Sequence, residues 1–226
     1  MSDEATASSQ IGRLRRRATS EGSESYLRRR KEIITAAGPV FHAKGLANTS
    51  VLDVSEQLGV DRASVYYYFN GKQDLFHAVI YDAIHDVVAR VKARADGAGS
   101  TRDKITEILA IVVGAYEEHY PALHVYLQED MRRIRLDPDD GQANRQAAEQ
   151  MAALAEEYMS VLERLIADGI AAGELRDIGS PALIASIMEG AVNWMHRWLK
   201  PSEGPSPDMV AAVLAELLMG GLSASG

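Results

Sequence analysis

The stretch DRASVYYYFNGK, residues 61–72, concentrates side chains that bind anions and the edges of bases. It contains an arginine, a serine, three consecutive tyrosines and a lysine, all of which can donate hydrogen bonds. Arginine recognises guanine acceptors, whereas lysine and hydroxyl groups contact phosphate oxygens. These residue types therefore support binding to a nucleic acid more readily than a chemical reaction.

Signatures of enzyme chemistry are missing from the sequence. It contains no GxSxG, no P-loop and no GxGxxG, and the absence of cysteine excludes disulfides and thiolate metal sites. The six histidines are scattered, and His85 with Asp82 and Asp86 has only a generic metal-ligand spacing. We therefore predict no enzyme activity, no catalytic residues, no metal site and no cofactor.

The spacing within residues 62–69 indicates how a helix would present the polar groups. Val65 and Phe69 are four residues apart, so both lie on one face of a helix and point to a core. The tyrosines between them then face outward, with Arg62 at the N-terminal end of the helix. Ala63 is small enough to let the backbone approach a ligand closely.

A second short helix and a tight turn precede this segment. Ser50 and Asp53 have the spacing of a capping box, Gly59 ends the first helix, and Asp61 caps the next. This pattern predicts a helix-turn-helix motif over about residues 50–70, whose second helix enters the major groove of DNA. The predicted DNA-facing residues are Thr49, Ser50, Arg62, Ala63, Ser64, Tyr66, Tyr67, Tyr68 and Lys72. The alternatives are a structural three-helix head with incidental tyrosines, or a surface for a membrane or a protein.

The charge distribution favours the DNA-binding interpretation. The net charge of the chain is −8, yet residues 10–72 hold 11 Lys and Arg against 6 Asp and Glu. A binder of phosphates needs only such a local basic surface. Residues 1–24 have a polar composition with an RLRRR run, which predicts a disordered basic arm that either solubilises the chain or touches DNA.

The apolar periodicity predicts an all-α fold of about nine helices, with no strand signal. Proline at position 39 should bend the first helix. No apolar run reaches the roughly 18 residues that a membrane span needs, and the N-terminus lacks a signal peptide. We therefore predict a cytoplasmic protein without a membrane partner.

Residues 32–80 resemble the DNA-binding head of the TetR family of bacterial transcriptional repressors. The resemblance rests on Phe41 and Gly45 at the end of the first helix, the start at residues 49–50, the LGV turn, the aromatic run and Lys72. Two departures are Gly38-Pro39 within the first helix and Tyr68, where the family often has histidine. The resemblance implies an all-α homodimer, with a helix-turn-helix DNA-binding domain over residues 25–75 and a ligand-binding and dimerisation domain over residues 76–226.

The last two predicted helices, about 180–199 and 206–222, carry apolar faces wider than one packing contact needs. They predict a dimer interface, although both could also be ordinary core helices. The predicted interface residues are Ile184, Ile187, Met188, Ala191, Trp194, Met195, Trp198, Val210, Val213, Leu214 and Leu217.

The middle helices supply candidates for an apolar effector cavity. The predicted lining residues are Val112, Tyr116, Tyr120, Leu123, Tyr126, Met131 and Trp194, most of which would be core residues in any case. Residues 119–133 and 193–210 resemble the branch of the family that controls fatty-acid and steroid breakdown in actinobacteria. This resemblance implies an acyl-CoA effector, for which Arg132, Arg133 and Arg135 could bind phosphates, unless they form a solvated helix end.

Together these patterns predict a repressor that a small apolar or acyl-CoA-type effector releases from a palindromic operator. Its predicted partners are double-stranded operator DNA, the effector and a second copy of the chain. One alternative is an activator or a nucleoid-type DNA-binding protein without an effector. Another is a helical protein-interaction module.

Overall fold

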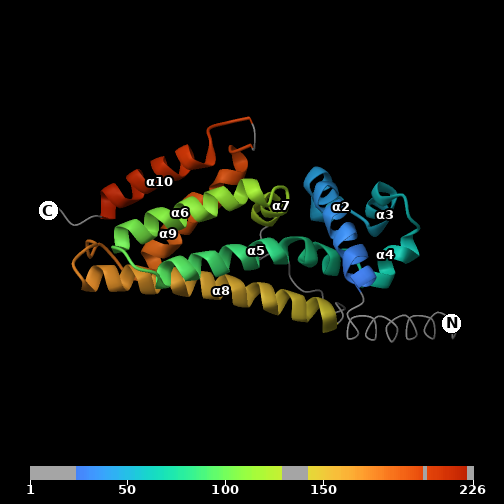
Figure 1. The fold of residues 1–226 in the computed structure, drawn as a ribbon, viewed down its shortest axis with the longest axis horizontal. Coiled ribbons are helices and arrows are strands. Elements are labelled where there is room, and N and C mark those ends of the chain that lie inside the picture. The colour runs from blue at the N-terminus through green and yellow to red at the C-terminus, as the bar shows by residue number, and fades with distance from the viewer. Residues whose placement is uncertain (1–23, 129–141, 201–202, 223–226) are drawn as a thin grey trace. The chain divides into compact units, whose positions relative to one another are not determined.

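The computed structural model describes residues 24–128, 142–200 and 203–222 (Figure 1). Within these ranges it contains nine α-helices, one short 3-10 helix and no strand, which confirms the predicted fold class. The helices are α2 (Glu24–Asn48), α3 (Val51–Leu58), α4 (Arg62–Tyr68), α5 (Lys72–Asp96), α6 (Thr101–Glu118), α7 (Ala122–Gln128), α8 (Gln142–Ala171), α9 (Pro181–Asn193), η1 (Trp194–Arg197) and α10 (Pro207–Leu222). The predicted basic arm lies outside these ranges, apart from residue 24.

The described chain divides into two compact units, and the division falls within α5. The first unit comprises residues 24–79 and 142–147, and the second comprises residues 80–128, 148–200 and 203–222. The predicted boundary at residue 75 is four residues earlier. None of the described helices is long and apolar enough to cross a lipid bilayer.

The first unit is a helical head around a small aromatic and aliphatic core. Phe41 of α2 and Phe76 of α5 meet edge to face, with ring centroids 5.3 Å apart. Val65 and Phe69 are almost completely buried, as their four-residue spacing predicts. These anchors hold the outward face of α4 in place.

The first helix of the head, α2, runs through Pro39 with helical dihedral angles. The non-helical conformation lies instead at Gly45, with φ 71° and ψ 163°. A positive φ favours glycine, which has no Cβ to clash with the backbone. Gly45 therefore ends the long part of α2 and directs the chain toward α3.

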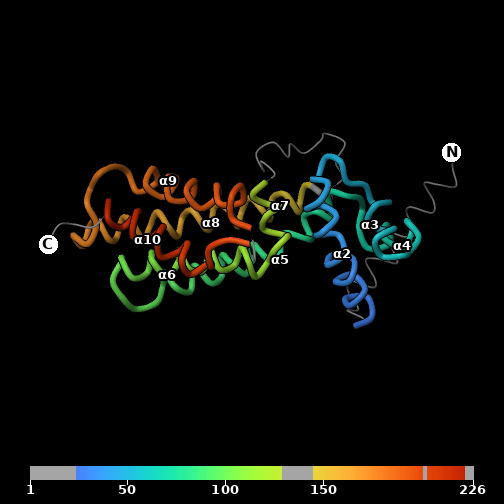
Figure 2. Tube along the Cα trace, turned by 90° about the horizontal axis from the view of Figure 1, so that it is seen from above, coloured from blue at the N-terminus to red at the C-terminus, as the bar shows by residue number. Residues whose placement is uncertain are grey.

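The second unit is a bundle in which α6 packs along α10 (Figure 2). Ion pairs from Lys92 to Glu157 and from Asp96 to Arg164 join α5 to α8. At Gly169 of α8, an added Cβ would lie 2.6 Å from the Thr101 methyl group. That glycine therefore permits the close approach of the start of α6.

The predicted helix over residues 180–199 is shorter than expected. The α-helix ends at Asn193, and a 3-10 turn, η1, carries Trp194–Arg197. Tighter winding rotates the side chains of η1 away from the directions that an α-helical wheel assigns to them.

Candidate nucleic-acid interface and effector cavity

Arg62 and Tyr66 form a single unit on the exposed side of α4. An Arg62 Nη2 group donates to the Tyr66 hydroxyl oxygen at 2.8 Å, and the guanidinium lies 5.1 Å from the centre of the tyrosine ring. Arg62 and Ala63 are exposed at the start of the helix. This arrangement orients a guanidinium for contact with base edges or phosphate while leaving room for the backbone to approach.

The start of α4 is fixed by Asp61. Its carboxylate accepts hydrogen bonds from the backbone N–H of Ser64 at 2.7 Å and from the Ser64 hydroxyl at 2.9 Å. These bonds hold the pKa of Asp61 below its usual range. The Ser64 hydroxyl thus already donates within the protein, and its predicted donation to DNA phosphate would require that bond to break.

The rings of Tyr67 and Tyr68 pack on Tyr26 of α2. Their centroids lie 6.2 Å and 4.9 Å from that of Tyr26. Burial raises the pKa of Tyr68, with a smaller contribution from the neighbouring Tyr67. Tyr26 was not among the predicted site residues, although its aromatic type at the start of the first helix is a visible signal.

Two further predicted DNA-facing residues build the turn before α3. Thr49 is only 2 % exposed, and its hydroxyl donates to the Gly45 carbonyl at 2.7 Å. In this conformation Thr49 is a structural residue and cannot contact DNA. Ser50 forms the predicted capping box with Asp53, in which its hydroxyl accepts from the Asp53 backbone N–H at 3.2 Å and the Asp53 carboxylate accepts from the Ser50 backbone N–H at 2.7 Å. Lys44 and Ser50 together hold the pKa of Asp53 well below its usual range.

Lys72 ties α5 to the end of α2. Its ammonium donates to the carbonyls of Leu46 and Ala47, both at 2.9 Å. Cations at the C-terminal end of a helix offset its unpaired carbonyls. Lys72 thus has a structural role, and one of its three ammonium hydrogens remains for another acceptor.

The second unit contains a cavity of about 80 Å³ between α5, α6, α7, α8 and the α9–η1 segment. Four predicted residues line it, namely Val112, Tyr116, Leu123 and Tyr126. The other lining residues are Ile84, Val87, Val88, Leu127, Leu154, Ala155, Tyr158, Glu189, Val192, Asn193 and Met195. The walls are mostly apolar, as expected for a small-molecule site.

Two predicted lining residues lie away from this cavity. Tyr120 is part of an aromatic cluster, with its ring 6.1 Å from Tyr116 and 5.6 Å from His124. Trp194 is 57 % exposed, and its ring lies under the Arg197 guanidinium at 4.3 Å. Neither residue therefore lines this cavity, and Trp194 lies on the same side of the helix as the exposed Leu183 and Ile187. Met131 and the three arginines at 132, 133 and 135 lie outside the described residues.

The polar groups of the cavity wall are tyrosines, an asparagine and one carboxylate. Tyr116 hydrogen-bonds to His124 Nδ1 at 2.6 Å, and burial raises the pKa of Tyr116 to about 12. Burial and the charge of Glu189 raise the pKa of Tyr126 and of Tyr158. Sequence reasoning missed Glu189, although it is the one charged residue in the α9 sequence PALIASIMEGAVN.

The predicted dimer residues separate into exposed and buried groups. Exposed apolar side chains form one stripe along α9, η1 and the residue that follows η1, and another on α10, and we call these two stripes the apolar faces. They comprise Leu183, Ile187, Trp194, Trp198, Met209, Val213 and Leu217. Ile184, Met188, Met195 and Val210 are instead buried in their own unit, so in this conformation they support the faces without forming them. Ala191 and Leu214 are intermediate.

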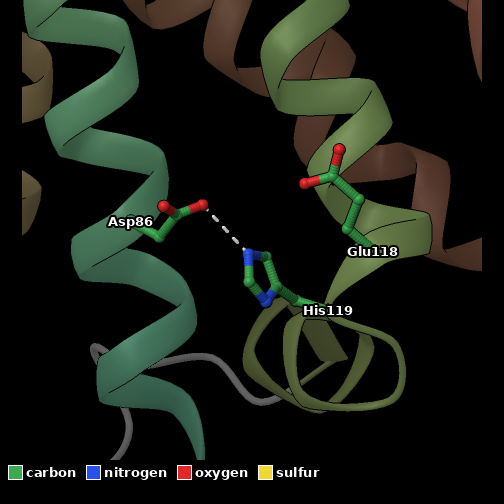
Figure 3. A group of neighbouring side chains, drawn as sticks. All are labelled: Asp86, Glu118 and His119. Carbon is green, nitrogen blue, oxygen red and sulfur yellow. Dashed lines mark hydrogen bonds and ion pairs between the residues drawn. The ribbon is translucent and has the colours of Figure 1, made fainter.

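Asp86, Glu118 and His119 bring their potential metal-ligand atoms within 4.8 Å of one another (Figure 3). Arg90 already contacts both carboxylates, at 3.3 Å from Asp86 and 2.6 Å from Glu118. His119 Nε2 lies 3.1 Å from Asp86. The guanidinium neutralises the charge that would attract a cation, so this cluster is an ion-pair network between α5 and the end of α6. His85 lies apart from it, stacked on Tyr81.

Both parts of the chain match known protein families. Residues 33–79 match the family model for bacterial regulatory proteins of the tetR family, and residues 98–222 match the tetracyclin repressor-like C-terminal domain. The chain therefore belongs to the TetR family of helix-turn-helix transcriptional regulators, with a ligand-binding C-terminal domain.

Among curated proteins, it is similar to the transcriptional repressor KstR2 of Mycolicibacterium smegmatis. The two are 23 % identical over 197 residues, which cover 87 % of this chain and 92 % of KstR2. The ketosteroid transcriptional regulator KstR2 of Mycobacterium tuberculosis shares the fold, with a TM-score of 0.76 and 19 % identity over 87 % and 96 % of the two chains. AibR, solved with isovaleryl coenzyme A and operator DNA, has a TM-score of 0.70 and 16 % identity over 84 % and 97 %. The similarity to KstR2 agrees with the resemblance predicted for residues 119–133 and 193–210.

Proposed function

We propose that this regulator is a repressor that binds a palindromic operator as a homodimer and is released by a compact effector. The observation that carries the DNA-binding assignment is the exposed Arg62–Tyr66 pair at the start of α4. The second helix of a helix-turn-helix motif contacts base edges through its N-terminal residues. A protein that contacts mainly the DNA backbone would have less need of an oriented guanidinium at the start of α4.

The homodimer is supported by the two apolar faces. Ile187 is 59 % exposed and Leu217 72 % exposed within a single chain. A soluble monomer rarely exposes a large apolar patch, and a symmetric partner would cover the same patch on both copies. A dimer would also allow two heads to reach half-sites about 34 Å apart on one side of the DNA.

The effector is proposed to occupy the cavity of the second unit. Its apolar wall suits an aliphatic group, and AibR was solved with isovaleryl coenzyme A, which carries a short branched acyl group. We therefore propose an acyl-CoA or another lipid-like ligand whose buried part is small. Binding that favours a conformation mismatched to the operator would set the affinities for DNA and effector against each other. Such a regulator would act in the cytoplasm and would need no enzyme activity of its own.

The test is a fluorescence-polarisation titration on DNA from the promoter of its own gene. The wild-type protein should prefer this DNA over a scrambled fragment, and its affinity should fall as salt rises. Arg62→Ala should bind this DNA more weakly and lose the preference at the one base position that Arg62 contacts. Arg102→Ala, which removes an arginine of α6 outside the head, is the matched control and should bind normally.

Two results would overturn the proposal in different ways. Equal affinity for unrelated sequences would indicate a nucleoid-type DNA-binding protein. Binding without any salt dependence, or no binding to DNA, would instead favour a helical protein-interaction module.

A further inference from the structure

Among the described residues, the cavity wall contains a carboxylate that has no counter-charge. Glu189 projects from α9 among apolar residues, and no lysine, arginine or histidine lines the cavity within the described residues. No hydrogen bond or ion pair connects Glu189 to any side chain in the described parts of the chain. A carboxylate in such surroundings gains from a partner that donates hydrogen bonds to it.

The tyrosines of the wall complement this acceptor. The charge of Glu189 reaches the hydroxyls of Tyr126 and Tyr158, whose pKa values it raises together with burial. Both phenols therefore remain protonated at neutral pH and keep a hydrogen to donate. The wall thus offers one anionic acceptor and neutral hydroxyl groups.

The size of the cavity limits the group that it can enclose. Its volume of about 80 Å³ is several times the roughly 10–15 Å³ that one water molecule needs. A branched group of about five non-hydrogen atoms is near this limit. A longer chain or a ring system would extend beyond this volume.

We propose that the buried end of the effector is a compact apolar group bearing a hydrogen-bond donor, a hydroxyl or an ammonium, which binds Glu189. Glu189 then acts as a specificity-determining residue that rejects carboxylates, because two like charges held close together repel each other. This inference rests on the proposed function, which assigns the cavity to the effector. It adds the chemistry of the buried end, which the apolar wall by itself does not specify.

The test compares three probes with the same carbon skeleton on the purified full-length protein. They are 2-methyl-1-propanol, 2-methylpropylamine and 2-methylpropanoate, and calorimetry or thermal shift without DNA measures their binding. The alcohol or the amine should bind at least tenfold more tightly than the carboxylate. The stronger of the two shows whether the donor is neutral or cationic.

Three variants test whether the selectivity among the probes depends on Glu189 and on the cavity. Glu189→Gln removes the charge with little change in shape, and it should weaken the amine at least tenfold while allowing the carboxylate to bind. Glu156→Gln, on the exposed side of α8, is the matched control for charge and should leave the order of affinities unchanged. Val112→Phe should fill the cavity and weaken all probes that bind within it.

Several outcomes would overturn the inference. These are a carboxylate that binds the wild-type protein as tightly as the alcohol and amine, selectivity that survives Glu189→Gln, or binding of none of the probes. The order of affinities in the wild-type protein tests the inference even where a variant fails to fold. These binding measurements contain no DNA, so a negative result in them does not contradict operator binding. A negative result in the operator assay likewise leaves the measured probe affinities unchanged.

Discussion

Leu217 provides a direct test of the proposed dimer. Its side chain is 72 % exposed on α10, so in a symmetric dimer through this face it would be covered in both copies. Full burial of a leucine contributes about 1.5–3 kcal/mol. Leu217→Ala removes this burial from both copies, although alanine keeps the Cβ. The free energy of dimerisation should therefore weaken by about 2–3 kcal/mol. The dimer dissociation constant should therefore rise about 30- to 150-fold.

Val210 on the same helix is the matched control. It is 5 % exposed within its own unit, so Val210→Ala removes two methyl groups from the core and not from the face. It should lower the free energy of unfolding by about 2 kcal/mol. Its effect on the dissociation constant should be much smaller than that of Leu217→Ala.

The assay is sedimentation velocity over a dilution series, with urea unfolding at two protein concentrations. Dimerisation makes the apparent stability depend on concentration, and Leu217→Ala should reduce that dependence. The reasoning fails if Leu217→Ala dissociates at the same concentration as the wild-type protein. It also fails if Val210→Ala has the larger effect on dissociation.

Three further predictions concern the head, the bundle and the ion-pair network. Arg62→Ala should cost about 1–3 kcal/mol of operator binding and relax preference at one base position, and Tyr66→Phe about 1 kcal/mol. Because the two side chains act together, polarisation titrations of the double variant should show a loss smaller than the sum, and additivity would contradict the pairing. Gly169→Ala should lower the free energy of unfolding by about 1–3 kcal/mol in urea titrations, since its Cβ would meet Thr101, and a stabilised variant would contradict that clash. Hydrogen bonding to His119, assisted by Arg90, lowers the pKa of Asp86. The stability that this carboxylate contributes is therefore present above the pKa of an unfolded aspartate, and it is lost as the pH falls through the folded pKa of Asp86. Asp86→Asn should therefore be less stable than the wild-type protein in urea titrations at neutral pH, by under about 1 kcal/mol since the pair is exposed, and the difference should vanish in acid.

Local rules were sufficient for the architecture of the head. The four-residue spacing of Val65 and Phe69 predicted their burial, and the Ser50–Asp53 spacing predicted the capping box. Gly59, with φ 67°, ends α3 as expected, and Asp61 caps α4. These features depend on residues within one or two helical turns, so the sequence contains all the information needed for them.

The roles of other candidate residues depend on contacts with distant parts of the chain. Lys72 meets the carbonyls of Leu46 and Ala47, and the buried Thr49 hydroxyl donates to Gly45. A wheel gives directions around a helix axis, but it does not say whether an outward residue meets solvent, DNA or another helix. Hydrogen-bonding types that suit phosphate also suit unpaired carbonyls at a helix end, so residue type alone could not separate the two roles.

The sequence by itself determined that the last two helices are broadly apolar and that the middle of the chain could enclose an apolar cavity. Only the tertiary structure decided that Ile184 faces the core while Ile187 is exposed, because one side of α9 packs within its own unit. It also placed Glu189 in the cavity wall and left Trp194 exposed beside Ile187. Periodicity fixes the angles between side chains of one helix, whereas the face that becomes buried depends on how separate helices pack together.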